Sequence, residues 1–375
     1  MRLAVLLLLT GGCRQIFGLD TPDPLRGDGG GNEIDGASDG QDGSVDAATE
    51  LCFSRPSLGL GACLAAPPTN DLSVSASTTI DTGTFALCAT LTTSTQDLCV
   101  VAAKSIAIGS GTVIRVIGAR PLVLFSPTMI EIDGTLDVAS HIGSGMPTSG
   151  AGENPPACGA TQGGASQGGG AGGSFGSRGG NGGNGVDINS MPGQAQLALP
   201  ITAFHGGCRG GIGAEGIAQA AYGGGAVAMF AATISINGTI NASGMAGPGA
   251  VISSKGGYGG ASGGMLVLSA PSVMLGTQGQ MFANGGAGGG GSSNSGAGAN
   301  GGEAMTFNSP IAGGQGGNNG DGGNAYPSVE NGQSGAGAAG AGGGGAGGAG
   351  AIVIFTNTVL PTPQRISPPP QLPGF

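Results

Sequence analysis

The sequence is poor in the residues that most binding and catalytic sites use. It has no Trp, three Tyr and two His, and aromatic residues make up 4% of its 375 residues. The chain therefore has few aromatic rings on which sugars or bases could stack. Only 11 Lys and Arg, scattered along the chain, stand against 21 Asp and Glu, which argues against nucleic acid as a partner.

Several common motifs are also missing. No Gly-rich run continues into Gly-Lys-Ser or Gly-Lys-Thr, which excludes a P-loop, and Gly-x-Gly-x-x-Gly is uninformative among 86 glycines. The seven cysteines contain no Cys-x-x-Cys pair, so zinc is a weak alternative to disulfides. We expect no metal and no cofactor. No apolar run approaches the roughly 20 residues needed to span a bilayer.

Residues 1–12 have the order of an export signal. A basic start precedes the apolar run Leu3–Leu9 and the small residues Thr10-Gly-Gly, directly before Cys13. This order resembles the lipobox of bacterial lipoproteins, in which the cysteine becomes the lipidated first residue. Thr10 stands where Leu is usual, so plain secretion is the alternative. By the same resemblance, Arg14 after the cysteine favours the outer over the inner membrane.

Residues 13–50 have the composition of a disordered tether. Nine acidic residues stand against two basic ones, and almost nothing apolar follows Leu25. Such a segment cannot bury enough surface to offset the entropy of ordering. A calcium loop at Asp39–Asp46 is the alternative, but it lacks the ligand spacing and the closing Glu of an EF-hand. A solvated spacer is therefore the favoured interpretation.

Six cysteines remain after Cys13, and an even number in an exported chain predicts disulfides. Fifteen pairings are possible, and the sequence does not decide among them. Neighbour spacing favours Cys52–Cys63, Cys88–Cys99 and Cys158–Cys208. The first two pairs would staple a polar cap over residues 51–100. The third would close a long glycine-rich segment near its two ends.

The middle of the chain repeats one strand pattern. Apolar and polar residues alternate through a strand, a Gly-Thr corner and a second strand, clearly at 130–138 and 234–242 and more loosely at 273–283. Residues 106–116 have the same rhythm. An apolar strand precedes each clear copy, and its four occurrences are 122–128, 227–233, 266–272 and 352–358.

The spacing of these copies predicts an all-β fold, a short parallel β-solenoid over residues 101–360. The step from Ile108 to Ile130 or Ile132 is 22 or 24 residues, typical of one solenoid turn. Later copies are further apart, and glycine-rich excursions fill the difference, which we expect to leave from the same corner each time. Their expected bounds are roughly 143–224, 244–264 and 285–350.

Two interpretations of the excursions are open. They are either flexible loops or bundled extended helices with three residues per turn, in which glycine lets backbones approach closely. The proline-rich residues 361–375 are expected to form a loose extended tail.

Few residues could carry chemistry. Glu131 and Asp133 share a strand face, and Asp137 follows across the corner, as outward carboxylates do in polysaccharide-cleaving solenoid enzymes. The next copy places Ser and Asn at these positions, so no acidic ladder forms and solvated surface is favoured. His141 and His205 flank a glycine excursion without a nearby nucleophile arrangement, so we assign no catalytic residue.

The start Cys13–Asp20, the acidic tether, the paired cysteines and the Gly-Thr corners together resemble a group of glycine-rich predicted lipoproteins of myxobacterial type. The resemblance covers nearly the whole chain. It implies location and architecture, and it carries over no activity and no functional residue.

The expected function is that of a lipid-anchored cell-surface protein, structural or adhesive and without catalytic activity. Its expected partners are the membrane, through the lipid, and cell-envelope or extracellular polymers. Its expected location is the outer membrane or cell surface, or otherwise the medium after secretion. The first alternative is a polysaccharide-active enzyme on a solenoid, which a groove lined by carboxylates would support. The second is a ligand-binding surface on the glycine-rich bundle, which would need a regular exposed Thr or Asn ladder.

Overall fold

The computed structural model describes residues 51–93, 96–143, 146–214, 220–336, 339–360 and 365–373. The export signal, Cys13 and the acidic tether lie outside the described residues. The described chain divides into two compact units, residues 51–54 with 61–67 and residues 55–60 with the described part of 68–373. Among the helices described, none has the length and apolarity needed to cross a membrane.

A two-stranded sheet comes first in the described chain. Strand β1 (Leu51–Arg55) pairs with β2 (Leu60–Leu64), and the 3-10 turn η1 (Pro56–Leu58) joins them. Pro56 presets the backbone at the start of the turn, and Gly59 ends it with a positive φ of 63°. The disulfide Cys52–Cys63 links the two strands, as the spacing predicted.

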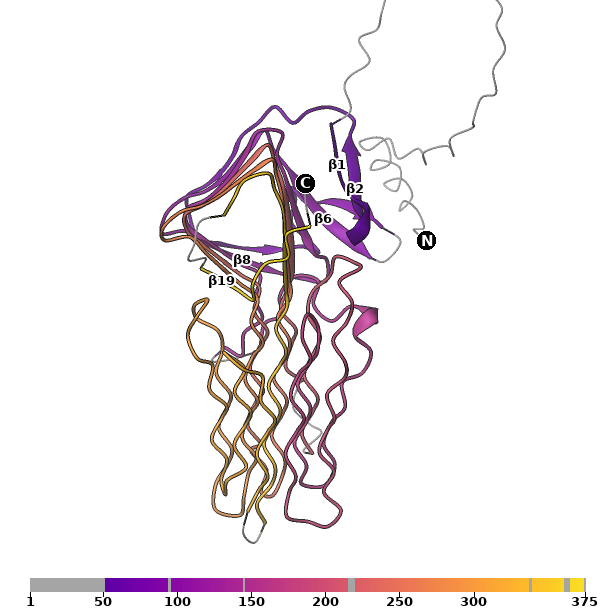
Figure 1. Ribbon diagram of the computed structural model, residues 1–375, viewed down its shortest axis with the longest axis vertical. Helices are drawn as coiled ribbons and strands as arrows, with labels where there is room; N and C mark the ends of the chain where they lie inside the picture. Colours follow the sequence, from indigo (N-terminus) through magenta and orange to yellow (C-terminus); the bar gives the residue numbers. More distant parts are fainter. Residues whose placement is uncertain are drawn as a thin grey trace, which may run out of the picture. The chain divides into compact units, whose positions relative to one another are not determined.

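The larger unit contains the predicted parallel β-solenoid, built from three sheets (Figure 1). The first sheet comprises β3 (Leu72–Val74), β7 (Ser105–Ile108), β10 (Met129–Ile132), β13 (Thr233–Ile236) and β16 (Ser272–Leu275). The second comprises β4 (Thr78–Asp81), β8 (Val113–Ile117), β11 (Thr135–Asp137), β14 (Thr239–Asn241), β17 (Gln280–Phe282) and β19 (Ile366–Ser367). The third comprises β5 (Ala89–Thr92), β6 (Asp97–Ala102), β9 (Leu122–Phe125), β12 (Ala226–Phe230), β15 (Met265–Ser269) and β18 (Ala351–Phe355). All pairs in these sheets are parallel except β5 with β6.

The strand register confirms the repeats found in the sequence. Leu122, Val227, Leu266 and Ile352 are paired in succession across the third sheet. In the first sheet Ile132 pairs with Ile236, although 104 positions separate them. The stack therefore continues in register across the excursions.

The core fills the interior of the solenoid with aliphatic side chains. In β10 and β13, buried isoleucines alternate with partly exposed residues, as a strand with one buried face requires. The third sheet differs, because every residue of β12, β15 and β18 is buried. Burial on both faces explains why its strands are continuous apolar runs in the sequence.

The Gly-Thr corners follow from close stacking of successive turns. Both N–H groups at the corner, those of Asn237 and Gly238, donate to the carbonyl of Ile132 in the turn below. A Cβ atom on Gly238 would lie 1.9 Å from the carbonyl oxygen of Gly134. Only glycine fits at such a distance, so the corner glycine is required by the stack.

All three glycine-rich excursions leave from one corner, as predicted. They run from β11 to β12, from β14 to β15 and from β17 to β18, always between the second and the third sheet. The turn from β8 to β9 shows the same corner without an insertion, closed by residues 118–121 alone. An excursion can therefore be inserted there without altering the stacked strands.

The excursions are not loose loops where the structure describes them. In the segment 342–348, successive N–H groups donate in rotation to three neighbouring segments, 330–333, 286–289 and 167–173. Its carbonyls accept from further neighbours, among them 257–263, again at every third residue. This is the pattern of extended helices with three residues per turn that bond only to each other. Figure 1 shows such segments running side by side away from the solenoid.

Backbone proximity explains the glycine content of this bundle. A Cβ on Gly344 would lie 1.9 Å from the carbonyl oxygen of Tyr258, and one on Gly172 would lie 1.7 Å from that of Ala346. Ala346 itself is accommodated, because its side chain packs with Phe282 and Ala287 in a small apolar cluster. Along a segment, Gly thus occupies the positions at which a Cβ atom would clash with another backbone, and Ala can occupy the positions at which it would not.

Two boundaries differ from those predicted. The solenoid begins at β3, near residue 72 and not at 101, because β3, β4 and β6 already pair with its next turn. The tail is paired in its described part: β19 adds to the second sheet, and Gln371 exchanges backbone hydrogen bonds with Ile352 and Ile354. The tail therefore continues the sheets where a loose segment was expected.

The remaining disulfides also join the predicted partners. Cys88–Cys99 lies within the first solenoid turn, and Cys158–Cys208 lies in the first excursion. The short 3-10 turn η2 (Pro156–Cys158) leads into the latter bridge. Three disulfides indicate an extracellular or periplasmic protein, because such bonds persist in oxidising compartments.

Candidate functional site

Among the described residues, the most highly connected group of charged side chains lies where the first excursion leaves the second sheet. Asp137 ends β11 and its Oδ1 accepts from the N–H of Ala139 at 3.1 Å. In the next turn Asn241 accepts from Ser243 in the same way, at 3.0 Å. An Asp or Asn at this position satisfies the first free N–H of an excursion, which explains why the two copies share it.

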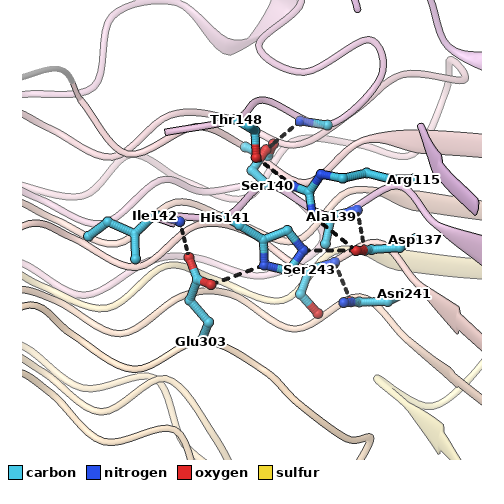
Figure 2. Close-up of polar contacts among 12 residues, drawn as sticks. Arg115, Asp137, Ala139, Ser140, His141, Ile142, Thr148, Asn241, Ser243 and Glu303 are labelled. Carbon is cyan, nitrogen blue, oxygen red and sulfur yellow. Dashed lines mark hydrogen bonds and ion pairs between the residues drawn. The ribbon is translucent and has the colours of Figure 1, made fainter. Parts of the chain in front are cut away.

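His141 links Asp137 to a distant part of the chain. Its Nε2 lies 3.0 Å from Oδ2 of Asp137, and its Nδ1 lies 3.0 Å from Oε2 of Glu303 in the third excursion. The other oxygen of Glu303 accepts from the backbone N–H of Ile142. Figure 2 shows the imidazole between the two carboxylates.

Arg115 completes the group from the neighbouring turn. It is paired in register with Asp137, and its Nη1 lies 3.2 Å from Oδ2 of that residue. Its Nη2 donates to the hydroxyl of Thr148. With His141 protonated, two cations balance two carboxylates, which removes the cost of unpaired charge at this partly buried place.

The charge state of His141 follows from this geometry. Burial of the ring lowers the pKa, but the hydrogen bonds to Asp137 and Glu303 outweigh it and raise the pKa to about 9. The ring is then a cation at neutral pH, with both nitrogens donating. A proton shuttle needs a free nitrogen, so this imidazole instead has a structural role. It acts as a clamp, which here means that it links the start of the first excursion to the third excursion.

Ser140 also has a structural role, although it stands next to His141 in the sequence. Its hydroxyl donates to the carbonyl of Gly223 and accepts from the N–H of Gly150 at 2.7 Å. The serine is thus bonded to the backbone and not to the imidazole, so the Asp, His and Ser found here do not form a nucleophilic triad.

The cluster should make stability fall as pH rises. Because the folded pKa of His141, about 9, lies above its ordinary 6.5, the stabilisation is complete below pH 6.5. It is lost as pH rises through 9. We expect the difference in unfolding free energy between wild type and His141→Gln to shrink by up to about 3 kcal/mol over this interval. Denaturant titrations at several pH values measure it, and a constant or widening difference contradicts the clamp.

The other carboxylates considered from the sequence do not join this group. Glu131 lies in β10, where it pairs with Ser235 of the next turn. Asp133 lies at the corner and accepts from the amide of Asn237 at 2.8 Å. The register thus confirms that no acidic ladder forms along the stack. Within the described ranges, no group of three or more His, Cys, Asp or Glu could hold a metal ion.

His205 lies apart from this cluster. It is buried within the first excursion, and its ring lies 4.7 Å from that of Phe175, centroid to centroid. Burial lowers its pKa, and the backbone hydrogen bond to Gly206 only partly opposes this. The two histidines of the chain are therefore in opposite states at neutral pH.

Sequence reasoning missed the partners of His141. Asp137 and His141 stand four positions apart in the sequence, but the turn of the chain out of the sheet between them, which brings their side chains together, has no sequence signal. Glu303 lies 162 residues further on, within glycine-rich sequence that gives no pairing signal.

Comparisons with known proteins add no relative. No protein-family model matches the chain, no curated protein matches it, and no solved structure matches it. The resemblance to glycine-rich predicted lipoproteins stays a prediction.

Proposed function

We propose that the chain is a lipid-anchored protein of the bacterial cell surface that acts structurally or in adhesion, without catalysis. The observation that carries the proposal is the glycine-rich bundle. Its backbone groups are used in bonds between segments, and its glycines are fixed by contacts with neighbouring backbones. When packing constrains so much of a sequence, the protein is typically a rigid structural or adhesive one, whose function depends on its shape and its outer surface.

The charged cluster supports the same proposal. His141, Asp137 and Glu303 are engaged with each other, and the hydroxyl of Ser140 is engaged with the backbone. These are the groups from which a catalytic site at this place would have to be built. Their mutual bonds favour a role in fastening the excursions.

Anchoring rests on Cys13, which lies outside the described residues. Acylation of this cysteine is the anchor that the sequence predicts, and Arg14 favours the outer membrane. We expect Cys13→Ser to move the protein from the membrane fraction to the soluble fraction. Fractionation followed by immunoblotting measures this, with Cys52→Ser as a control that should stay bound. Retention of Cys13→Ser in the membrane fraction contradicts the proposed anchor.

The enzymatic alternative has a separate test. A polysaccharide-active solenoid would need two carboxylates flanking one bond, roughly 5–10 Å apart. Glu131, Asp133 and Asp137 instead occupy a sheet face, a corner and a strand end with different partners. We expect purified protein to retain polysaccharides in pull-down assays without releasing new chain ends. Release that Glu131→Gln or Asp133→Asn abolishes would favour the enzyme.

A ligand-binding ladder is the less favoured surface. Thr135 and Thr239 are aligned in the second sheet, but Gln280 follows them and Val113 precedes them. The amide of Gln280 donates to the hydroxyl of Thr239 at 3.0 Å. A ladder of two threonines, one of them already bonded, offers little repeat for a regular ligand.

A further inference from the structure

A cavity of about 180 Å³ lies beside His205, between two segments of the first excursion, 155–157 and 203–205. Its walls include Pro155, Pro156, Ala203 and Phe204. None of the residues that line it is an acid, a Lys or an Arg. The lining therefore suits a neutral, mostly apolar occupant, because a charge would be desolvated there without a partner.

His205 and Gln96 are the two polar side chains that line this cavity. His205 is 5% exposed, and its Nδ1 lies 2.7 Å from the carbonyl oxygen of Gly206. A carbonyl only accepts, so Nδ1 carries the proton. Burial lowers the pKa of the ring, which is therefore neutral at pH 7. The remaining nitrogen, Nε2, is a lone-pair acceptor with no partner among the described residues.

The surrounding contacts hold this acceptor in place. The ring packs at 4.7 Å on Phe175, and the disulfide Cys158–Cys208 joins the two chain segments that line the cavity. The side-chain amide of Gln96 donates to the carbonyl of Phe204, and this bond joins two residues that line the cavity. No residue of the described chain donates to Nε2, so a ligand in the cavity with one donor can form a hydrogen bond there.

Size limits what that ligand can be. An apolar cavity of about 150 Å³ accommodates benzene, so one of this volume admits a single six-membered ring with a small substituent. The occupant should carry one hydrogen-bond donor and no charge. A phenol meets each requirement, since its ring is apolar and its hydroxyl is a strong donor.

We propose that this cavity binds a small phenol, with the ring between Pro155, Pro156 and Phe204 and the hydroxyl donating to Nε2 of His205. The site does not depend on the proposed surface function. It is also separate from the His141 cluster, so variants at one need not affect the other.

The test uses the purified full chain with phenol and with toluene, which has a similar ring but no donor. Calorimetry should show saturable phenol binding to the wild type. In His205→Phe, which keeps an aromatic ring but removes the acceptor, the ratio of phenol to toluene affinity should fall about tenfold. An unchanged ratio, or no saturable phenol binding to the wild type, overturns the proposal.

Two further measurements do not depend on the folding of His205→Phe. Phenol should move the ¹⁵N resonance of Nε2 in wild-type His205, and toluene should leave it nearly unchanged. Ala203→Met fills the cavity from its half-buried wall and should weaken both ligands by more than tenfold. An Nε2 resonance indifferent to phenol, or wild-type phenol affinity in Ala203→Met, places the ligand elsewhere and overturns the site.

Discussion

Replacing Gly344 by alanine should cost about 3 kcal/mol of unfolding free energy or more, although it adds a single methyl group. The new Cβ would lie 1.9 Å from the carbonyl oxygen of Tyr258 and 2.3 Å from its carbonyl carbon. Both atoms belong to backbone that is itself hydrogen-bonded, so neither can withdraw as a flexible side chain would. Denaturant titration of wild type and variant measures the loss.

Gly296 provides the matched control. The nearest atom to a Cβ at this position is the Cα of Gly317, 3.9 Å away, which is ordinary contact. Gly296→Ala should be neutral or slightly stabilising, since alanine restricts the unfolded chain. If the two variants lose similar free energy, backbone proximity is not what selects glycine in the bundle.

The second large effect is expected at Ile236 in the solenoid core. Its side chain is fully buried and is paired with Ile132 on one side and Leu275 on the other. Ile236→Asp would place a carboxylate among aliphatic side chains with no partner. We expect a loss of more than about 4 kcal/mol, or failure to fold, as for an unpaired buried charge.

Ser235→Asp is the adjacent comparison. Ser235 is half-buried on the outer face, where it pairs with Glu131 and Met274. The new carboxylate faces Glu131, and like charges on neighbouring strands repel, so a loss below about 1 kcal/mol is expected. Equal losses in Ile236→Asp and Ser235→Asp, measured by the same titrations, would mean that the inward and outward positions are misassigned.

The solenoid could be predicted because its signal is carried by side chains. Ile130, Ile132, Ile234 and Ile236 alternate with polar residues, and this period identifies both a strand and its buried face. The corner glycines marked the ends of the strands. The first turn was missed, since Leu72 and Val74 form a strand of three residues, too short for a clear period.

The bundle could be suspected but not assembled from the sequence. Glycine has no side chain, so Gly344 and Gly347 carry no mark of the segments to which they bond. For the same reason the sequence did not reveal Glu303 as a partner of His141, because the position of Glu303 depends on how the third excursion packs. The cysteines paired as their neighbour spacing favoured, although the sequence alone left fifteen connectivities open.

The rotation of backbone hydrogen bonds along residues 342–348 has a consequence for how this protein can evolve. The carbonyls of Gly342, Gly345 and Gly348 accept from 257–263 in the second excursion, and the N–H groups of Gly342, Gly345 and Gly348 donate to 167–173 in the first. Deletion of the first or the second excursion would leave a row of backbone N–H or C=O groups of the third excursion without hydrogen-bond partners. We therefore expect related sequences to keep all three excursions together. Insertions should accumulate at the outer turns of the excursions, where they interrupt no such row.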